Sequence, residues 1–433
     1  MFVGLIAAHL WLLVNLKFTA WPEMLLWPYL VVKGLLPYSN MAIAHTPILI
    51  GKLAVFYQIF GVGILQLKIF TWILILFTDI VIYWVSKKLW GRKIAFIALA
   101  ILPVWQLFFD GNGLWFDLFL APIALILYYL VKSKRFFWAG IIFALGILSK
   151  QTFVWFIIPV LFSKVNYKQF IFGGILVGAL FSLLLFPLGI FQDFIIWAIN
   201  FGIFVLPGSL GQINLPDIKS LAVSVFPFTV LILTLLVKKL KNINLITWAI
   251  FGSLGAYPRF EYFHFQPAIP FLAMGTALVI NSFDWKKRLN KSLITFYVLG
   301  CLFLFGSFFI RNWGEGTRFF EKNVDEVVIY VRSQTTPGDK IFVMNWWDNI
   351  YPLTGTLPAT NPWVPQLSWY QEIPGIQEEE ISDLKDSKPK LILLQEYSGT
   401  GLSSYKPKLL NDFLMDNYKL STKVAGISVY IPK

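Results

Sequence analysis

Residues 65–109 read LQLKIFTWILILFTDIVIYWVSKKLWGRKIAFIALAILPVWQLFF, two long apolar runs separated by a short basic connector. A helix needs about 20 mostly apolar residues to cross the hydrocarbon core of a membrane, with a range of roughly 17–25. Residues 65–86 and 93–109 meet this requirement, and the connector at residues 87–93 carries Lys and Arg but no acid. The stretch therefore predicts two membrane-spanning helices joined by a cytoplasmic turn.

The same alternation of apolar runs and polar connectors continues along most of the chain. Apolar runs of this kind predict eleven spans, at residues 1–17, 65–86, 93–109, 115–131, 136–149, 152–163, 169–187, 220–237, 243–257, 265–280 and 292–310. Several of these runs are short, and the pair 136–149 and 152–163 is expected to be tilted or broken near Ser149. An odd number of spans places the two termini on opposite sides of the membrane.

The composition agrees with a protein that crosses the membrane many times. Of the 433 residues, 57% are hydrophobic and only 14% are charged, whereas soluble domains are about 25% charged. The single cysteine, Cys301, lies in an apolar run, so the chain has no disulfide framework and no cysteine metal site. The three histidines, His9, His45 and His264, are too far apart in sequence to show metal-ligand spacing.

The net charge of +13 is concentrated in alternate connectors. Five short connectors hold 16 Lys and Arg against one acid; they are residues 87–93, 132–135, 163–169, 238–242 and 284–291. The opposite connectors hold six charges of each sign. By the positive-inside rule the N-terminus is cytoplasmic and residues 311–433 are extracytoplasmic. No basic face is left to contact phosphates, so nucleic-acid binding is excluded.

The first apolar run begins at Met1 but has neither a basic n-region nor a small-residue cleavage site. It is therefore expected to be a retained anchor. A long external loop follows at residues 18–64. Pro22 suits the first position of a helix and Gly34 suits the position after its end, which predicts an interfacial helix over residues 22–33. A second helix is expected over residues 46–60.

From Arg311 onward the composition is that of a soluble domain. Helices are expected at 323–334, 378–386 and 406–418, and strands at 341–346, 390–395 and near 426–431. This alternation predicts a small α/β layer, and it contains neither a G-x-G-x-x-G motif nor a P-loop that would indicate nucleotide binding.

The fold class predicted from these elements is an all-α polytopic membrane bundle of about 11 transmembrane helices plus a small C-terminal extracytoplasmic α/β domain. The bundle has a long first external loop with interfacial helices. The expected domains are residues 1–310 and residues 311–433.

Polar residues on the predicted outer face could line a cavity between the helices. Charged groups at membrane depth are costly, and they usually face a cavity or a partner. The outer-face residues of this kind are Glu23, His45, Asp110, Asp117, Lys150, Asp193, Asp217, Arg259, Glu261 and His264.

The acids also have ordinary structural explanations. A carboxylate in the first turn of a helix is stabilised by the macrodipole by about 0.3–1 kcal/mol, which would account for Glu23 and Asp117. Asp110, in FFDGNGLWFD, follows a helix end and suits a turn or a cap. Asp79 lies within a span and is expected to reach toward the cytoplasmic surface or to bond locally.

The cations leave two interpretations open. Lys150, in LGILSKQTF, lies between two apolar runs on the outer face, where the positive-inside rule disfavours it. It could extend to lipid headgroups or bind an anion. Arg259 lies two residues before Glu261, so an internal ion pair is the structural alternative to ligand binding there.

Four stretches, taken in order, resemble a known family. They are Glu23 followed by Gly34-Leu35-Leu36-Pro37-Tyr38 and His45-Thr46-Pro47; Asp110; Ala144-Leu145-Gly146-Ile147-Leu148-Ser149-Lys150; and Arg259, Tyr262, His264, Pro267 and Pro270. With them, the membrane part resembles integral-membrane glycosyltransferases of the C superfamily (GT-C). The branch is that of dolichyl-phosphate-mannose protein mannosyltransferases and bacterial lipid A aminoarabinose transferases.

The resemblance implies a mannosyltransferase-like enzyme that uses a polyprenyl-phosphate-linked sugar and transfers the sugar at the outer face with inversion. It implies that Glu23 is the general base and that Asp110 orients the acceptor or the phosphate-binding groups. Lys150 and Arg259, with His264, would bind the phosphate and stabilise the charge it gains on leaving. His45, Tyr38 and Tyr262 would support the site. The other expected partners are the lipid bilayer and an acceptor glycan, lipid or protein.

The chain departs from the family pattern at one position. Many relatives carry an Asp-Glu pair in the first loop, whereas Pro22 precedes Glu23 here. A lone acid argues against a two-carboxylate metal site, so no obligatory metal or other cofactor is expected. A divalent cation held jointly by Asp110 and Glu23 stays open as an alternative.

Three other functions are weighed against sugar transfer. A lipid-linked-sugar flippase or another transporter would explain charges at membrane depth, but the chain shows neither repeated halves nor paired broken helices. An oligosaccharide ligase would share the same motifs. A non-catalytic scaffold would use its external domain to bind partners. The aromatic stretch at residues 345–370 could stack on carbohydrate or form a packed loop core.

Overall fold

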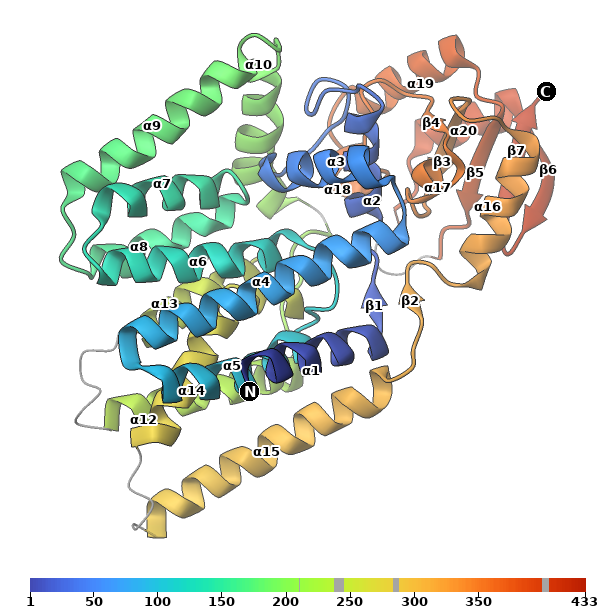
Figure 1. Cartoon of the computed structure of the whole chain (residues 1–433). Helices are drawn as coiled ribbons and strands as arrows, with labels where there is room; N and C mark the ends of the chain where they lie inside the picture. Colours follow the sequence, from blue (N-terminus) through green and yellow to red (C-terminus); the bar gives the residue numbers. More distant parts are fainter. Residues whose placement is uncertain (210, 237–244, 283–287, 399–404) are drawn as a thin grey trace. The chain divides into compact units, whose positions relative to one another are not determined.

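The structure is a computed structural model that describes residues 1–209, 211–236, 245–282, 288–398 and 405–433 (Figure 1). The basic connector 238–242 and part of the connector 284–291 lie outside the described residues. The chain divides into two compact units. The first unit comprises Met1–Thr19, Ile69–Leu183 and Asn214–Glu315, and the second comprises Ala20–Lys68, Leu184–Ile213 and Gly316–Lys433.

Helices fill the first unit, and the described part of each predicted span is mostly helical. The elements are α1 (Phe2–Asn15), strand β1 (Phe18–Thr19), α4 (Ile64–Trp90), α5 (Arg92–Phe108), α6 (Phe116–Lys132), α7 (Phe136–Ile147), η1 (Gln151–Phe156), α8 (Ile157–Leu161), α9 (Tyr167–Leu185), α11 (Ile218–Val225), η4 (Phe226–Phe228), α12 (Thr229–Leu236), α13 (Leu245–Ser253), η6 (Leu254–Ala256), η7 (Tyr262–Phe265), α14 (Ile269–Ser282) and α15 (Arg288–Asn312). The expected break near Ser149 is present as the end of α7.

Four described helices are long and apolar enough to cross a membrane, namely Ile64–Trp90, Tyr167–Leu185, Phe191–Gly208 and Lys291–Asn312. The other apolar helices are shorter. Together with the apolar composition they make this an integral membrane protein, whereas the count of eleven spans stays a prediction. The helix at Phe191–Gly208 lies in residues that the sequence analysis assigned to an external connector.

Helix α14 is the centre of the first unit. Every side chain from Ile269 to Val279 is buried, and the helix packs against α5, α12 and α13. Aromatic rings fill the space beside it, with Tyr128 and Trp248 each lying edge-on or tilted against Phe271 at ring-centroid distances of 5.6 and 5.5 Å. A helix that is apolar on all sides is buried in this way.

A polar network crosses this apolar core and corrects one expectation. Asp79 is fully buried and does not reach a membrane surface. His9 Nδ1 on α1 lies 2.8 Å from Asp79 Oδ2 on α4, and His9 Nε2 lies 3.1 Å from Gln106 Oε1 on α5. A buried carboxyl group needs a hydrogen-bond donor. For Asp79 the fold supplies this donor from a residue far away in sequence.

Helices α7 and α9 approach each other through glycine. A Cβ atom on Gly140 would overlap the carbonyl oxygen of Phe170, and one on Gly173 would overlap the carbonyl oxygen of Phe137. The two helices therefore meet backbone to backbone, as small residues allow in membrane bundles.

The second unit combines three separate segments of the chain. Its elements are α2 (Pro22–Val32), α3 (Ile48–Phe60), α10 (Phe191–Phe194), the π-helical η2 (Ile195–Val205), η3 (Leu206–Gly208), β2 (Thr317–Arg318), α16 (Lys322–Gln334), β3 (Lys340–Met344), α17 (Ile350–Thr354), β4 (Leu357–Pro358), α18 (Ser368–Gln371), α19 (Ile376–Ser387), β5 (Leu391–Gln395), α20 (Lys408–Asn417), β6 (Tyr418–Val424) and β7 (Ile427–Pro432).

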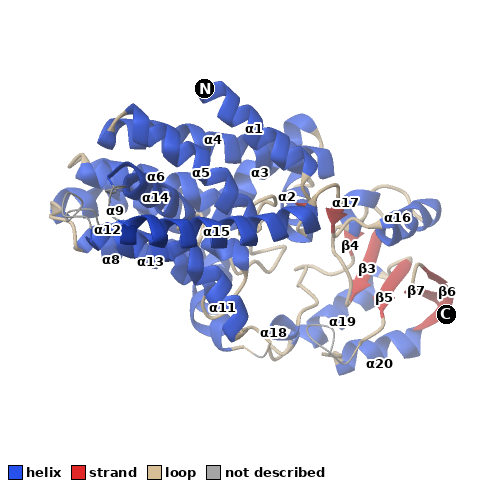
Figure 2. Ribbon diagram, turned by 90° about the horizontal axis from the view of Figure 1, so that it is seen from below, coloured by secondary structure: helices blue, strands red, loops and turns tan. Residues whose placement is uncertain are grey.

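A mixed sheet with the order β4-β3-β5-β7-β6 forms the core of this unit. Strands β4, β3 and β5 are parallel, with Val343 opposite Leu393, and β7 runs antiparallel to both β5 and β6. Figure 2 shows α16 on one side of the sheet and α19 and α20 on the other. Strand β5 is buried along Leu391–Leu394, as a strand covered on both faces should be.

The sequence predicted most of these elements but not all of them. Helices α2, α3, α16, α19 and α20 and strands β3, β5 and β7 lie where they were expected. Strand β6 was not predicted. It pairs with β7 through a turn in which Ala425 and Gly426 have φ values of 49° and 86°. No turn motif of the Asn-Gly kind marks that hairpin in the sequence.

Segments of residues 20–64 pack against the C-terminal residues within the second unit. The Tyr29 hydroxyl on α2 donates a 2.9 Å hydrogen bond to the Thr356 carbonyl. The Ala42 amide donates to the Trp363 carbonyl at 2.8 Å, and the Trp363 amide donates to the Asn40 carbonyl at 2.9 Å. The loop is thus anchored by main-chain hydrogen bonds as well as by its apolar side chains.

The glycine contact between α7 and α9 generates a stability prediction. Gly140→Ala should destabilise the protein by about 1–3 kcal/mol, because its methyl group has to push a backbone carbonyl aside. The measurement is the thermal unfolding midpoint of the purified protein in detergent. Gly178→Ala on α9 is the matched control, since no atom lies within 4 Å of the added Cβ and alanine favours a helix over glycine. Equal midpoints for the two variants would contradict the close packing.

Candidate active site

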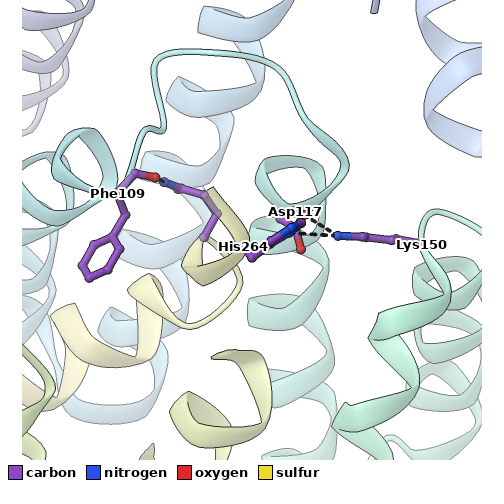
Figure 3. Close-up of polar contacts among 5 residues, drawn as sticks. Phe109, Asp117, Lys150 and His264 are labelled. Carbon is purple, nitrogen blue, oxygen red and sulfur yellow. Dashed lines mark hydrogen bonds and ion pairs between the residues drawn. The ribbon is translucent and has the colours of Figure 1, made fainter. Parts of the chain in front are cut away.

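Three polar side chains meet inside the first unit, at the ends of three different elements (Figure 3). Asp117 lies in the first turn of α6, Lys150 stands between α7 and η1, and His264 belongs to η7. All three are buried, with exposed fractions of 0%, 4% and 8%. Only Lys150 and His264 were predicted as site residues; Asp117 had been given a helix-end explanation.

The three side chains converge on one carboxylate oxygen. Lys150 Nζ lies 2.5 Å and His264 Nδ1 lies 2.8 Å from Asp117 Oδ2, and the two nitrogens are 3.2 Å apart. An ammonium group has donors only, so both nitrogens donate to Asp117 if His264 carries its proton on Nδ1. The other oxygen, Asp117 Oδ1, is buried and has no hydrogen-bond partner among the described residues.

Local backbone structure explains why these side chains meet. Asp117 is the second residue of α6, which begins at Phe116, and the helix macrodipole favours a negative charge there. Lys150 leaves the helical conformation, with φ −160° and ψ 134°, after its amide has bonded to the Gly146 carbonyl at the end of α7. The backbone at Lys150 is therefore extended, and the lysine no longer belongs to α7.

Gln266 holds the segment of His264 in place. Its Nε2 donates to the carbonyls of Gln106 and Phe109 at 2.8 and 2.7 Å, at the C-terminal end of α5. Figure 3 labels Phe109 beside the Asp117 cluster. The last carbonyls of a helix have no intrahelical partner, so one glutamine both satisfies them and fixes η7 against α5.

The remaining candidates of the first unit are Arg259, Tyr262 and Asp110. Arg259 Nη2 is 3.8 Å from Glu261 Oε1, with 26% and 37% of the two side chains exposed. The ion pair considered from the sequence is therefore present, but an exposed pair of this kind contributes only about 0–1 kcal/mol. Asp110 is exposed and has φ 51°. Burial raises the pKa of the Tyr262 phenol, and the charge of Asp110 adds to that rise.

The second unit holds Glu23, Tyr38 and His45. Glu23 is the second residue of α2, after Pro22, and is half-buried. Tyr38 is buried, has φ 70°, and its hydroxyl donates to the His45 carbonyl at 2.9 Å. The His45 ring lies 6.1 Å from Trp27, centroid to centroid. These three residues shape the surroundings of α2 and the chain that follows it.

Asp348 is a residue near Glu23 that the sequence analysis did not identify. It belongs to the aromatic stretch 345–370 and precedes α17. Burial, with the negative charge of Glu23 adding to it, raises the pKa of Asp348 well above its usual range. The sequence offered one indication of Asp348: it directly follows Trp346 and Trp347, and a charge in an aromatic stretch requires a partner or a function.

Within the part of the chain that the structure describes, no three His, Cys, Asp or Glu side chains lie close enough together to hold a metal ion. The Asp117 cluster contains a single carboxylate whose charge is already met by Lys150. Its composition suits an anion, because the lysine retains N–H donors beyond the one directed at Asp117.

Part of the chain matches a described family. The family model of dolichyl-phosphate-mannose-protein mannosyltransferases matches residues 44–191. This range contains His45, Asp110, Asp117 and Lys150. A search of curated protein sequences finds no match.

Solved structures share the fold over nearly the whole chain. ArnT from Cupriavidus metallidurans in the apo state is 11% identical, with a TM-score of 0.68, over 99% of this chain and 97% of that one. The same protein bound to undecaprenyl phosphate is 12% identical, with a TM-score of 0.67 and the same coverage.

A more distant likeness is to the archaeal oligosaccharyltransferase AglB from Archaeoglobus fulgidus, in complex with an inhibitory peptide and a dolichol-phosphate. It is 10% identical, with a TM-score of 0.53, over 100% of this chain and 74% of that one. The family match over residues 44–191 and the shared fold agree with the resemblance that the sequence predicted.

Proposed function

We propose that the protein transfers a sugar from a polyprenyl-phosphate donor to an acceptor hydroxyl at the extracytoplasmic face of the membrane, with inversion at the reactive carbon. In this proposal residues 1–310 carry the transferase and residues 311–433 are an extracytoplasmic domain. The N-terminus is cytoplasmic, as the charge of the connectors indicates. Mannose is the sugar that the family match suggests.

The observation that carries the proposal is the buried cluster of Lys150, Asp117 and His264. A lysine with 4% exposure in an apolar bundle carries a cost that a purely structural residue rarely incurs. The proposal is also supported by proteins of similar fold whose structures were solved with undecaprenyl phosphate and with dolichol-phosphate. Arg259, on the segment that leads to His264, would add a second cation.

The reaction can be written with Glu23 as the base. Glu23 accepts the proton of the acceptor hydroxyl, and the oxygen of that hydroxyl attacks the anomeric carbon of the sugar. The bond from that carbon to the phosphate oxygen breaks, and its electron pair leaves with the polyprenyl phosphate. Lys150 and Arg259 stabilise the negative charge that the phosphate gains, which is the step where preorganised cations are most effective. Asp110 would orient the acceptor or the phosphate-binding cations.

No metal has a role in this scheme. A phosphate leaves readily without protonation or Lewis-acid assistance when cations surround it, and the proposal assigns that task to side chains. Tyr38 and His45 would hold the loop that follows Glu23, and Tyr262 would support Arg259 from the same segment. The acceptor class, whether glycan, lipid or protein, is left to experiment.

Removing the base should stop transfer and leave donor binding intact. We expect Glu23→Gln to lower turnover of radiolabelled polyprenyl-phosphate mannose by about 10²–10⁴-fold in nanodiscs, because general-base catalysis contributes that much. Glu378→Gln is the matched control, since it removes an exposed carboxylate in the first turn of α19 that the proposal does not use. If Glu23→Gln turns over donor like the wild type, the transferase assignment of Glu23 is wrong, and a transporter or a scaffold explains the protein better.

Removing the buried cation should weaken binding of the lipid phosphate. We expect Lys150→Ala to reduce the affinity of the purified protein for undecaprenyl phosphate by at least about tenfold, because a hydrogen bond to a charged group contributes about 1.5–3 kcal/mol. Lys219→Ala, at an exposed lysine of the first unit, should bind like the wild type.

Lys150→Ala leaves the buried Asp117 carboxylate without its lysine. The variant could then fail to fold, because breaking a buried pair costs about 3–5 kcal/mol. The double variant Lys150→Ala/Asp117→Asn removes both charges and should fold while still binding weakly. Wild-type affinity in the folded double variant would show that Lys150 does not contact the phosphate.

A further inference from the structure

A hollow lies between the starts of α7 and α9 in the first unit, where these two helices run side by side (Figure 1). Its volume is about 470 Å³, and it is lined by Arg135, Phe136, Phe137, Trp138, Gln169 and Phe172. Binding sites for small ligands usually measure about 300–1,000 Å³. The hollow is therefore large enough to hold the head group of a lipid.

The aromatic wall of the hollow is fixed by the packing of the two helices. The ring of Phe137 lies 5.8 Å from that of Phe172 and 5.5 Å from that of Trp138, centroid to centroid. A Cβ atom on Gly173 would overlap the carbonyl oxygen of Phe137, so the backbones meet directly beside these rings. The wall thus belongs to packed helices, and its shape does not depend on a loop.

The two connectors next to the hollow carry cations and no acid. These cations are Lys132, Lys134, Arg135, Lys164 and Lys168. All five residues are exposed, and none forms an ion pair with another described residue. Arg135 is the one that lines the hollow, and a guanidinium can bind a phosphate through two parallel N–H groups. The charge around the hollow therefore suits an anion.

The start of α7 adds hydrogen-bond donors at the same place. Arg135 occupies the N-cap position of this helix, and no side chain caps it. At the start of α9, by contrast, the Gln169 amide donates to Asn166 Oδ1 at 3.3 Å. The first amides of a helix attract anions, so an anion beside Arg135 would also meet the uncapped amides of α7.

The helix surface beside the hollow is apolar and exposed. Trp138 and Phe172 have exposed fractions of 57% and 64%, and Ile171 and Ile175 on α9 are exposed as well. Helix α9 is one of the four described helices that are long and apolar enough to cross a membrane. Exposed apolar side chains on such a helix are suited to contact acyl chains. A ligand that fits both surfaces has an anionic head and an apolar tail.

We propose that the hollow binds an anionic phospholipid of the bilayer, with its phosphate at Arg135 and Gln169 and its acyl chains along the exposed face of α9. Basic pockets between membrane helices on the cytoplasmic side bind anionic head groups of lipids. The connectors 132–135 and 163–169 are two of the basic connectors that indicate the cytoplasmic side. The lipid would therefore come from the cytoplasmic leaflet. A free phosphate would leave the apolar face unused.

The lipid site is separate from the proposed donor site. Arg135 precedes α7 and Lys150 follows it, with a helix of twelve residues between them. At a rise of 1.5 Å per residue this helix is about 18 Å long. The hollow and the cluster of Lys150, Asp117 and His264 thus lie at opposite ends of α7. Lipid binding here does not require sugar transfer, so a failure of either assignment leaves the other intact.

Native mass spectrometry of the full chain in detergent measures the binding of single lipid molecules. Wild type should bind dioleoylphosphatidylglycerol more tightly than dioleoylphosphatidylcholine, which has no net charge. Arg135→Gln should weaken the first phosphatidylglycerol adduct by at least about tenfold, because a hydrogen bond to a charged group is lost, and should leave phosphatidylcholine binding unchanged. Equal affinity of the wild type for the two lipids would overturn the proposal.

The matched control is Arg92→Gln. It removes the same charge from the basic connector before α5, and Arg92 does not line the hollow. Arg92→Gln should bind phosphatidylglycerol like the wild type. If it loses as much affinity as Arg135→Gln, the lipid is attracted by the basic surface as a whole, and the hollow is not a site.

A second variant places a negative charge inside the hollow. Gln169→Glu should weaken phosphatidylglycerol binding at least as much as Arg135→Gln, because the new carboxylate repels the phosphate. Both positions are exposed, so neither variant disturbs the core. Wild-type affinity in Gln169→Glu would show that the lipid binds elsewhere.

Competition identifies the class of ligand. Undecaprenyl phosphate and inorganic phosphate, each at the concentration of phosphatidylglycerol, should displace little of it from the wild type. Displacement by undecaprenyl phosphate that is abolished in Arg135→Gln would make the hollow a site for the lipid carrier. Displacement by inorganic phosphate would make it a site for a free anion. Either result would overturn the assignment to a phospholipid.

Discussion

A charge can be buried in an apolar helix bundle only where an opposite charge and further hydrogen bonds meet it, because desolvation costs several kcal/mol per ion. Lys150 satisfies this condition through Asp117 and His264. The consequence reaches beyond the three side chains. It requires the start of α6, the end of α7 and the turn η7 to converge on one point, and this convergence fixes how the surrounding helices are arranged.

The same constraint explains the second polar network of the first unit. His9 bridges Asp79 and Gln106, and Gln266 satisfies the carbonyls at the end of α5. Because Gln266 lies two residues after His264, the support of α5 and the position of the cluster depend on the same short segment. Gln106 joins the two networks near the end of α5, since its side chain contacts His9 and its carbonyl accepts a hydrogen bond from Gln266.

The sequence predicted what depends on local pattern. Hydropathy located the apolar helices, and Pro22 and Gly34 located α2, because caps and apolar runs act within one element. It did not predict the helix at Phe191–Gly208 or strand β6. The first has the Pro, Gly and Asp of a connector around it, and the second is stabilised only by pairing with β7, so tertiary contacts decide both. The partner of Asp79 was missed for the same reason, since no local pattern places His9 beside it.

The candidate site divides along the same line. Lys150 and His264 could be predicted, because both lie in stretches that carry the family resemblance, and Lys150 is also a cation in a connector that the charge pattern predicts to be external. The parts supplied by Asp117 and Asp348 could not, because each depends on a contact made after folding. A carboxyl group has no fixed chemistry of its own: Asp117 lies at the start of a helix, where the backbone favours a negative charge, and only the folded chain adds the lysine that meets this charge.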